Sequence, residues 1–239
     1  MKSSHVDYLR HLERLAQQCV PENFYLWPRT PLDHDHQSKI TERVGVSDHS
    51  VHDPNSRPAL IIAALRRFRD QVPEDFSVLD IACGDAIVLW QIKKAFPRAR
   101  CYGVDSNTGK FGTHNMVQQE GVELFNAFIQ HLFASDPPVP FDVSLMLNTY
   151  RGWDSADLRE HERALPQAAD AWFAENTRYT IVTATGAQIR HLKRLGFSVT
   201  RLGRGEDDST MVCISKSKWL QPFWHRILSF GKRRLGAVA

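Results

Sequence analysis

The stretch VLDIACGDA (78–86) joins an apolar run to a helical pattern through a turn of small and acidic residues. Small residues let the backbone come close to a ligand, and the N–H groups of the following helix point toward it. The turn therefore predicts a ligand site at Ala82, Gly84 and Asp85. A further acid, Asp105, ends the next apolar run, where a carboxylate can accept hydrogen bonds from both hydroxyls of an adenosine ribose and disfavours a 2′-phosphate.

Histidines and acids gather near the N-terminus, where six of the 11 histidines precede residue 53. The runs DHDH (33–36) and DHSVHD (48–53) could supply metal ligands, a general base such as His36, or solvated and hydrogen-bonded side chains. An H-x-H motif with scattered acids has no second half of defined spacing, so we expect no metal site here. His36 stays a candidate catalytic base.

Two other motifs fail on their spacing. The stretch GVDSNTGKF (103–111) contains Gly-Lys, but it has five residues between its glycines and a phenylalanine after the lysine, which excludes a phosphate-binding loop. No G-x-S-x-G motif of a hydrolase nucleophile is present.

Strands and helices alternate along the part of the chain that holds these residues. A first helix is expected from Ser4 to before Pro21, because Ser4 can cap it and apolar residues follow at helical spacing. Strands are then expected at 77–82, 100–105, 122–126, 142–147 and 179–184, and helices at 57–70, 87–96, 110–120, 155–174 and 188–195. Residues 196–215 form two strand-like segments that meet at a polar turn, which predicts an antiparallel hairpin.

Strands separated by helices predict a parallel sheet with helices on both faces. The fold class is therefore α/β, with a Rossmann-like, doubly wound sheet that is mostly parallel and ends in a C-terminal antiparallel hairpin. An N-terminal helical and irregular cap precedes it. We expect three parts: an N-terminal helix and cap segment (1–57), a ligand-binding domain (58–216) and a basic amphipathic tail (217–239).

Composition narrows the class of protein. With 239 residues, 42% of them hydrophobic, the chain can bury a substantial core. The tail alone holds five basic residues and no acid, more than the net charge of +3, so the rest of the chain is slightly acidic and we expect no nucleic-acid partner. No apolar run reaches the roughly 18 to 20 residues of a membrane span, and the N-terminus is unlike a signal peptide. We expect a cytoplasmic protein whose cysteines are reduced.

VLDIACGDA followed by YGVDSN resembles the first two motifs of class I S-adenosylmethionine-dependent methyltransferases, and LKRLGFSVTRLGRGEDDSTMVCIS resembles their final antiparallel strand pair. The match covers residues 76–215. The resemblance implies S-adenosylmethionine as cofactor and a domain of that family at 58–216. It also implies that Asp80, Ala82 and Gly84 line the methionine end of the cofactor, with Asp85 beside them in the turn. Asp105 would then hold the ribose, Ser106 and Gln130 would lie near the adenine, and Asn148 would lie near the methionine moiety.

Two departures from the family pattern keep other functions open. The usual third glycine is Ala86, and the third strand, VELFNAFIQ (122–130), lacks the acid that often contacts the adenine amine. A non-catalytic cofactor-binding or interaction protein is therefore one alternative. Another is an NAD-dependent oxidoreductase on a related fold, for which Asp105 would serve equally well. A third is an unrelated nucleotide-binding fold whose acids cap turns.

Methyl transfer from a sulfonium needs an aligned acceptor and, for a hydroxyl, removal of its proton. The segment LNTYRGWDSADLREHE (147–162) follows the fourth strand and should face the methyl group, which makes Tyr150 a candidate catalytic residue. Tyr150, Arg151, Trp153 and Asp154 suit a polar or anionic acceptor. We expect a small-molecule or glycoconjugate acceptor, with O-transfer slightly favoured over N-transfer. The alternative is a loop in which Trp153 serves packing.

The tail KWLQPFWHRILSFGKRRLGAVA (218–239) places its large apolar residues on one half of a helical wheel. Such a helix could dock on the protein's own core. Alternatively, its tryptophans, phenylalanines and terminal basic triplet could attach the protein peripherally to the inner face of a membrane. That attachment would favour a lipid-linked or envelope-glycan acceptor.

Overall fold

One mixed sheet organises the molecule. The structure is a computed structural model, and it describes residues 4–18, 56–106, 114–147, 149–152, 164–204 and 209–216. Within these residues seven strands pair in the order β3-β2-β1-β4-β5-β7-β6. They are β1 (Ser77–Ile81), β2 (Arg100–Asp105), β3 (Val122–Asn126), β4 (Phe141–Met146), β5 (Thr177–Ala184), β6 (Phe197–Arg204) and β7 (Thr210–Lys216). The first five are parallel, and β7 runs antiparallel between β5 and β6. The predicted doubly wound sheet with a C-terminal hairpin is confirmed.

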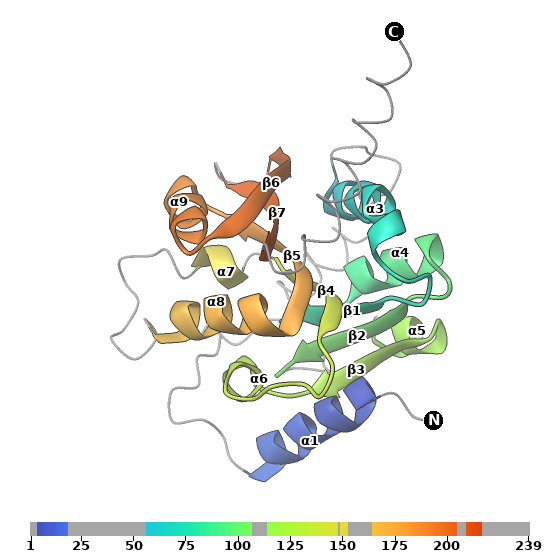
Figure 1. Cartoon of the computed structure of the whole chain (residues 1–239). Coiled ribbons are helices and arrows are strands. Elements are labelled where there is room, and N and C mark those ends of the chain that lie inside the picture. Colours follow the sequence, from blue (N-terminus) through green and yellow to red (C-terminus); the bar gives the residue numbers. More distant parts are fainter. Residues whose placement is uncertain are drawn as a thin grey trace, which may run out of the picture.

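Helices cover both faces of this sheet (Figure 1). The first face packs against α3 (Arg57–Arg67), α4 (Ile87–Ala95) and α5 (His114–Gln119), and a short 3-10 turn, η1 (Arg69–Gln71), follows α3. The second face packs against α1 (Ser4–Gln18), α6 (Ile129–Phe133), α7 (Thr149–Gly152), α8 (Ala164–Asn176) and α9 (Gly186–Arg194). Two apolar cores therefore sandwich the sheet.

Strand alternation explains the two cores, because successive side chains of a strand point to opposite faces. Val78 belongs to the core under α3 and α4, and the next residue, Leu79, belongs to the core on the other face. On α1, Leu9 and Leu12 are fully buried in that second core. The first helix therefore shares its core with the sheet, and the division at residue 57 stays a prediction for the residues between α1 and α3.

Most expected elements lie within one or two residues of their predicted bounds, and the differences have local causes. The helix expected to Asp70 stops at Arg67 and continues as η1. Of the helices expected at 110–120 and 155–174, the structure describes α5 and α8; the residues before them lie outside the described chain. Helices α6 and α7 were not predicted, because four or five residues are too few to show a 3.6-residue period.

Candidate functional site

The turn between β1 and α4 winds through three left-handed residues within five positions. The backbone φ angles are 58° at Ala82, 54° at Gly84 and 58° at Ala86. A left-handed conformation costs a non-glycine residue roughly 1–2 kcal/mol, which is why glycine suits such positions. Two alanines of the turn, Ala82 and Ala86, therefore adopt a left-handed geometry that glycine usually supplies.

The methyl group of Ala86 faces away from solvent. Ala86 is fully buried and belongs to the apolar core on the α4 side of the sheet, together with Leu89. It is also the N-cap of α4 but carries no capping hydroxyl, and Asp85 supplies a cap instead, since its Oδ1 accepts a hydrogen bond from the Ile87 N–H at 3.1 Å. The side chain at the position of the usual third glycine therefore packs within the apolar core.

Gly84 stands at the open part of the turn. A Cβ built on this residue would meet no atom within 4 Å, so the described chain leaves space directly in front of it. The Gly84 N–H donates to Asp105 Oδ2 at 3.1 Å, which ties the turn to the end of β2. The Asp105 backbone oxygen in turn accepts from the Ala127 N–H at 3.2 Å, just beyond β3. The carboxyl ends of three neighbouring strands thus meet at one open edge.

Close packing behind the turn depends on Gly103 in β2. A Cβ at this residue would lie 2.7 Å from Leu124 Cδ2 and 2.8 Å from the Cys83 sulfur, closer than real side-chain contacts permit. The absence of a side chain at Gly103 lets Cys83 reach the sheet, where its N–H donates to the Val104 oxygen at 3.1 Å. Gly103 was not among the predicted site residues, although a glycine inside an apolar strand is a signal of close approach.

Three carboxylates set the electrostatics of the edge. Asp80 is 4% exposed, and burial raises its pKa well above the usual value, with the nearby charges of Asp85 and Asp105 adding to the rise. The same burial and the same three acids raise the pKa of Cys83. No group of three or more His, Cys, Asp or Glu in the described part of the chain is arranged to hold a metal ion. The crowded acids at this end of the sheet favour a positively charged ligand over an anion.

The predicted cofactor residues fall into three groups. Asp80, Ala82, Gly84, Asp85, Asp105 and Ser106 come together at the carboxyl ends of β1 and β2. Gln130 lies on α6, after β3, and is half-buried. Asn148 lies outside the described residues. At the end of β3, where the resemblance would place an acid, the amide of Asn126 fits best with its nitrogen toward the Asp105 and Ser106 oxygens, at 3.3 and 3.0 Å.

Of the two predicted catalytic residues, His36 lies outside the described chain and Tyr150 lies on α7. Tyr150 is 2% exposed, and its hydroxyl donates to Asp170 Oδ1 on α8 at 2.7 Å. The other oxygen of Asp170 lies 3.0 Å from Nε2 of His191 on α9. Gln188 donates to the Tyr150 backbone oxygen at 2.6 Å. The Tyr150 hydroxyl is thus occupied within the protein rather than presented at the surface.

Asp170 and His191 were not predicted from the sequence. Asp170 is 4% exposed, and burial raises its pKa while the bonds from Tyr150 and His191 lower it. A signal existed, because an acid among the apolar residues of an inward helix face is rarely left buried without partners. What the sequence could not supply was the identity of the partners on α7 and α9.

Two predictions concern segments outside the described residues: the histidine and acid runs at 33–53 and the tail at 217–239. No described helix is long and apolar enough to cross a membrane. Membrane attachment through the tail stays a prediction.

The strand order and the C-terminal antiparallel hairpin are those of a Rossmann-like methyltransferase fold. DesVI from Streptomyces venezuelae superposes with a TM-score of 0.51 at 13% identity, over 78% of this chain and all of DesVI. The pyocyanin biosynthetic protein PhzM gives 0.50 at 15%, over 90% of this chain and 70% of PhzM. The bifunctional kinase-methyltransferase WbdD gives 0.50 at 16%, over 86% of this chain and 46% of WbdD. At these identities the similarity establishes the fold.

No protein-family model matches the sequence, and no curated protein matches it.

Proposed function

We propose that this protein binds S-adenosylmethionine at the β1–α4 turn and transfers its methyl group to a small-molecule or glycoconjugate acceptor. The observation that carries the proposal is the open face at Gly84 beside three carboxylates. S-adenosylmethionine brings an ammonium and a sulfonium cation to such a turn, together with a ribose whose hydroxyls need an acceptor. Asp80 and Asp85 supply negative charge for the methionine end, and Asp105 supplies the ribose acceptor. Ser106 and Gln130 would border the adenine, and Asn148 the methionine moiety.

The acidic edge also argues against the NAD-dependent alternative. A dinucleotide places its pyrophosphate at the N-terminus of the helix after the first strand, and here that position is bordered by Asp80 and Asp85. Phosphate charges there would add to the negative charges of Asp85 and Asp105, which already raise the pKa of the buried Asp80, whereas a cationic cofactor relieves that repulsion.

For a hydroxyl acceptor we assign the role of base to His36 and a positioning role to Tyr150. The Tyr150 hydroxyl is already a donor to Asp170, so it is poorly placed to take a proton from an acceptor. Its backbone oxygen accepts a hydrogen bond from Gln188 on α9, and its ring packs against Phe173 on α8. Tyr150 therefore fixes α7, the first helix after β4, against its neighbours. The engaged hydroxyl is also the observation that favours the second candidate, a cofactor-binding protein that transfers no methyl group.

Calorimetry on the full chain tests the cofactor. We expect S-adenosylmethionine and S-adenosylhomocysteine to bind and NAD to show no heat of binding. Binding of NAD without S-adenosylmethionine would overturn the proposal. Incubation with methyl-labelled S-adenosylmethionine and fractionated cell extract then separates the two candidates, because only an enzyme moves label into an acceptor that a heat-denatured control leaves unlabelled.

A further inference from the structure

A cavity of about 290 Å³ opens near the amino end of β1, whereas the β1–α4 turn lies at the carboxyl end of the same strand. Its walls come from the end of α3, from η1, from the segment before β1 and from the end of α4. β1 lies between the cavity and the turn, and its five residues span roughly 13 Å at about 3.3 Å per residue. The cavity is therefore a separate place from the proposed cofactor site, and a ligand bound there does not depend on the proposed function.

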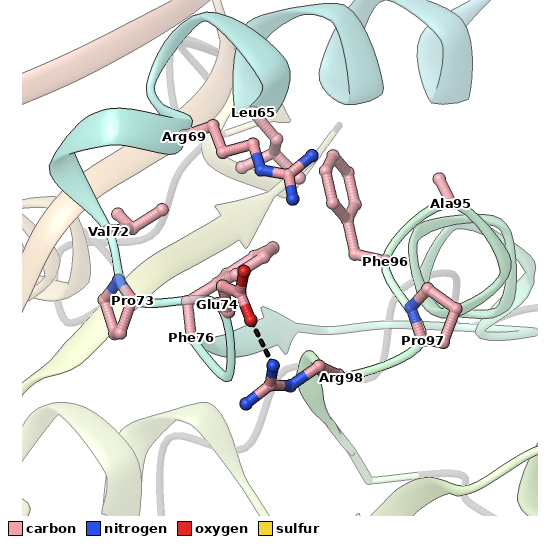
Figure 2. Close-up of a pocket in the computed structure, with 10 residues that line it drawn as sticks. All are labelled: Leu65, Arg69, Val72, Pro73, Glu74, Phe76, Ala95, Phe96, Pro97 and Arg98. Carbon is pink, nitrogen blue, oxygen red and sulfur yellow. Dashed lines mark hydrogen bonds and ion pairs between the residues drawn. The ribbon is translucent and has the colours of Figure 1, made fainter.

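The floor of the cavity is apolar and aromatic. Leu65 and Phe76 are 2% and 4% exposed, and the ring of Phe96 meets that of Phe76 edge-on, with centroids 5.4 Å apart and an interplanar angle of 77°. Figure 2 shows both rings lining the same space, with Val72 and Pro73 along another side. Aromatic rings favour edge-to-face or offset contact with a further ring, so this floor suits a flat aromatic body.

The charges on the cavity are unbalanced. Arg98 forms an ion pair with Glu74, so these two lining charges compensate each other (Figure 2). Arg69 lines the cavity and extends its guanidinium toward Phe96 (Figure 2). Within the described part of the chain it makes no hydrogen bond or ion pair. One positive charge is left over an aromatic floor. A guanidinium binds a carboxylate through two parallel hydrogen bonds.

We propose that this cavity binds a small aromatic carboxylate, with the ring against Phe76 and Phe96 and the carboxylate on Arg69. Its volume lies at the lower end of the roughly 300–1,000 Å³ of ligand pockets, which limits the occupant to about one ring. A dianion would be poorly matched, because Glu74 already compensates Arg98.

Benzoate is the probe, titrated into the full chain and followed by amide and Arg Nε–H NMR signals. We expect saturable shifts at residues that line the cavity, and at least tenfold weaker binding of benzamide, which has the same shape without the charge. Shifts confined to other surfaces, or equal affinity for the two probes, would overturn the proposal.

Variants separate this site from general surface binding. Arg69→Gln should weaken benzoate binding about tenfold, the loss of one charge-assisted pair. The matched control Arg67→Gln removes an exposed arginine on the same segment that does not line the cavity, and it should leave the affinity unchanged.

Glu74→Gln is expected to increase benzoate binding, a result that damage to the fold would not produce. Removing this carboxylate releases Arg98 and makes the cavity more positive, so benzoate should bind about two- to threefold more tightly. Weaker or unchanged binding in this variant would contradict the assignment of an anionic ligand.

Discussion

Asp105, at the end of β2, holds the β1–α4 turn by accepting a hydrogen bond from the Gly84 N–H at 3.1 Å. An ionised carboxylate offers about four lone-pair sites on its two oxygens, so the same group can accept from a ligand hydroxyl while it holds Gly84. The residue predicted to recognise a ribose is therefore also the residue that fixes the shape of the turn.

Replacing Asp105 by alanine should weaken S-adenosylmethionine binding at least tenfold, because both the ribose acceptor and the restraint on Gly84 are lost. Calorimetry measures the affinity. The control is Asp70→Ala, an exposed acid on η1, for which we expect no change. Unchanged affinity in Asp105→Ala would remove Asp105 from the site.

Gly84→Ala tests the open face of the turn. The new methyl meets no protein atom within 4 Å, but φ is +54°, so the protein should fold with a loss of about 1 kcal/mol of unfolding free energy. The methyl would occupy the space proposed for the cofactor and should abolish S-adenosylmethionine binding. Gly196→Ala, at φ +82° beyond α9 with Lys216 Nζ 3.8 Å away, carries similar backbone strain, so it should cost similar stability and leave the cofactor affinity intact.

The hydrogen bond between Tyr150 and Asp170 should make the effects of two substitutions on the free energy of unfolding non-additive. Asp170→Ala leaves a buried hydroxyl without its acceptor and should cost about 3 kcal/mol, and Tyr150→Phe alone should cost about 1–2 kcal/mol. In the Asp170→Ala background, Tyr150→Phe should cost almost nothing more, because its partner is already gone. Urea denaturation gives these values. Tyr179→Phe, whose hydroxyl bonds Gln71 at a different place, should be additive with Asp170→Ala.

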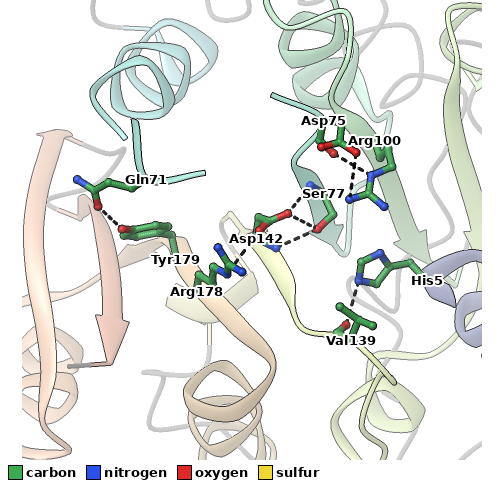
Figure 3. Close-up of polar contacts among 9 residues, drawn as sticks. All are labelled: His5, Gln71, Asp75, Ser77, Arg100, Val139, Asp142, Arg178 and Tyr179. Atoms are coloured by element: carbon green, nitrogen blue, oxygen red, sulfur yellow. Dashed lines mark hydrogen bonds and ion pairs between the residues drawn. The ribbon is translucent and has the colours of Figure 1, made fainter. Parts of the chain in front are cut away.

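His5 should make the protein less stable in mild acid. It is 2% exposed, and its ring stacks on that of Phe141 with centroids 4.2 Å apart. Its Nε2 lies 2.9 Å from the Val139 oxygen, as Figure 3 shows. Burial lowers its pKa from the usual 6.5, with Arg100 also lowering it and Asp142 and the bond to Val139 opposing. Below pH 6.5 the unfolded chain takes up a proton that the folded chain does not, so stability falls as pH falls toward the folded pKa.

Thermal melts over that pH range give the measurement. His5→Phe keeps a ring against Phe141 and should flatten the pH dependence between about pH 7 and pH 5. His11→Gln changes an exposed histidine of the same helix and should leave the slope as in the wild type. An unaltered slope in His5→Phe would contradict the assignment.

Attachment of the tail to membranes is tested with anionic liposomes. At low salt the full chain should sediment with phosphatidylserine vesicles, a chain ending at Ser217 should stay in solution, and high salt should release the full chain. If both forms stay in the supernatant at low salt, the tail has no membrane role.

The sequence determined the order along the chain of the strands and of the longer helices, because these are long enough for their hydrophobic period to be read, and it determined the position of the β1–α4 turn. It also placed Asp80, Gly84 and Asp105 at strand ends, which a parallel sheet necessarily brings to one edge. These features follow from local pattern and from the topology that such a pattern allows.

Only the tertiary structure decided which groups meet across elements. In the sequence Asp170 is a single acid in a helical pattern, and the structure shows that α7 and α9 place Tyr150 and His191 against its carboxylate. In the same way, Ala86 looks like a defect in a glycine motif until its methyl is found in the core. The direction of a side chain and its partners depend on packing between segments far apart in sequence, and no periodicity records that packing.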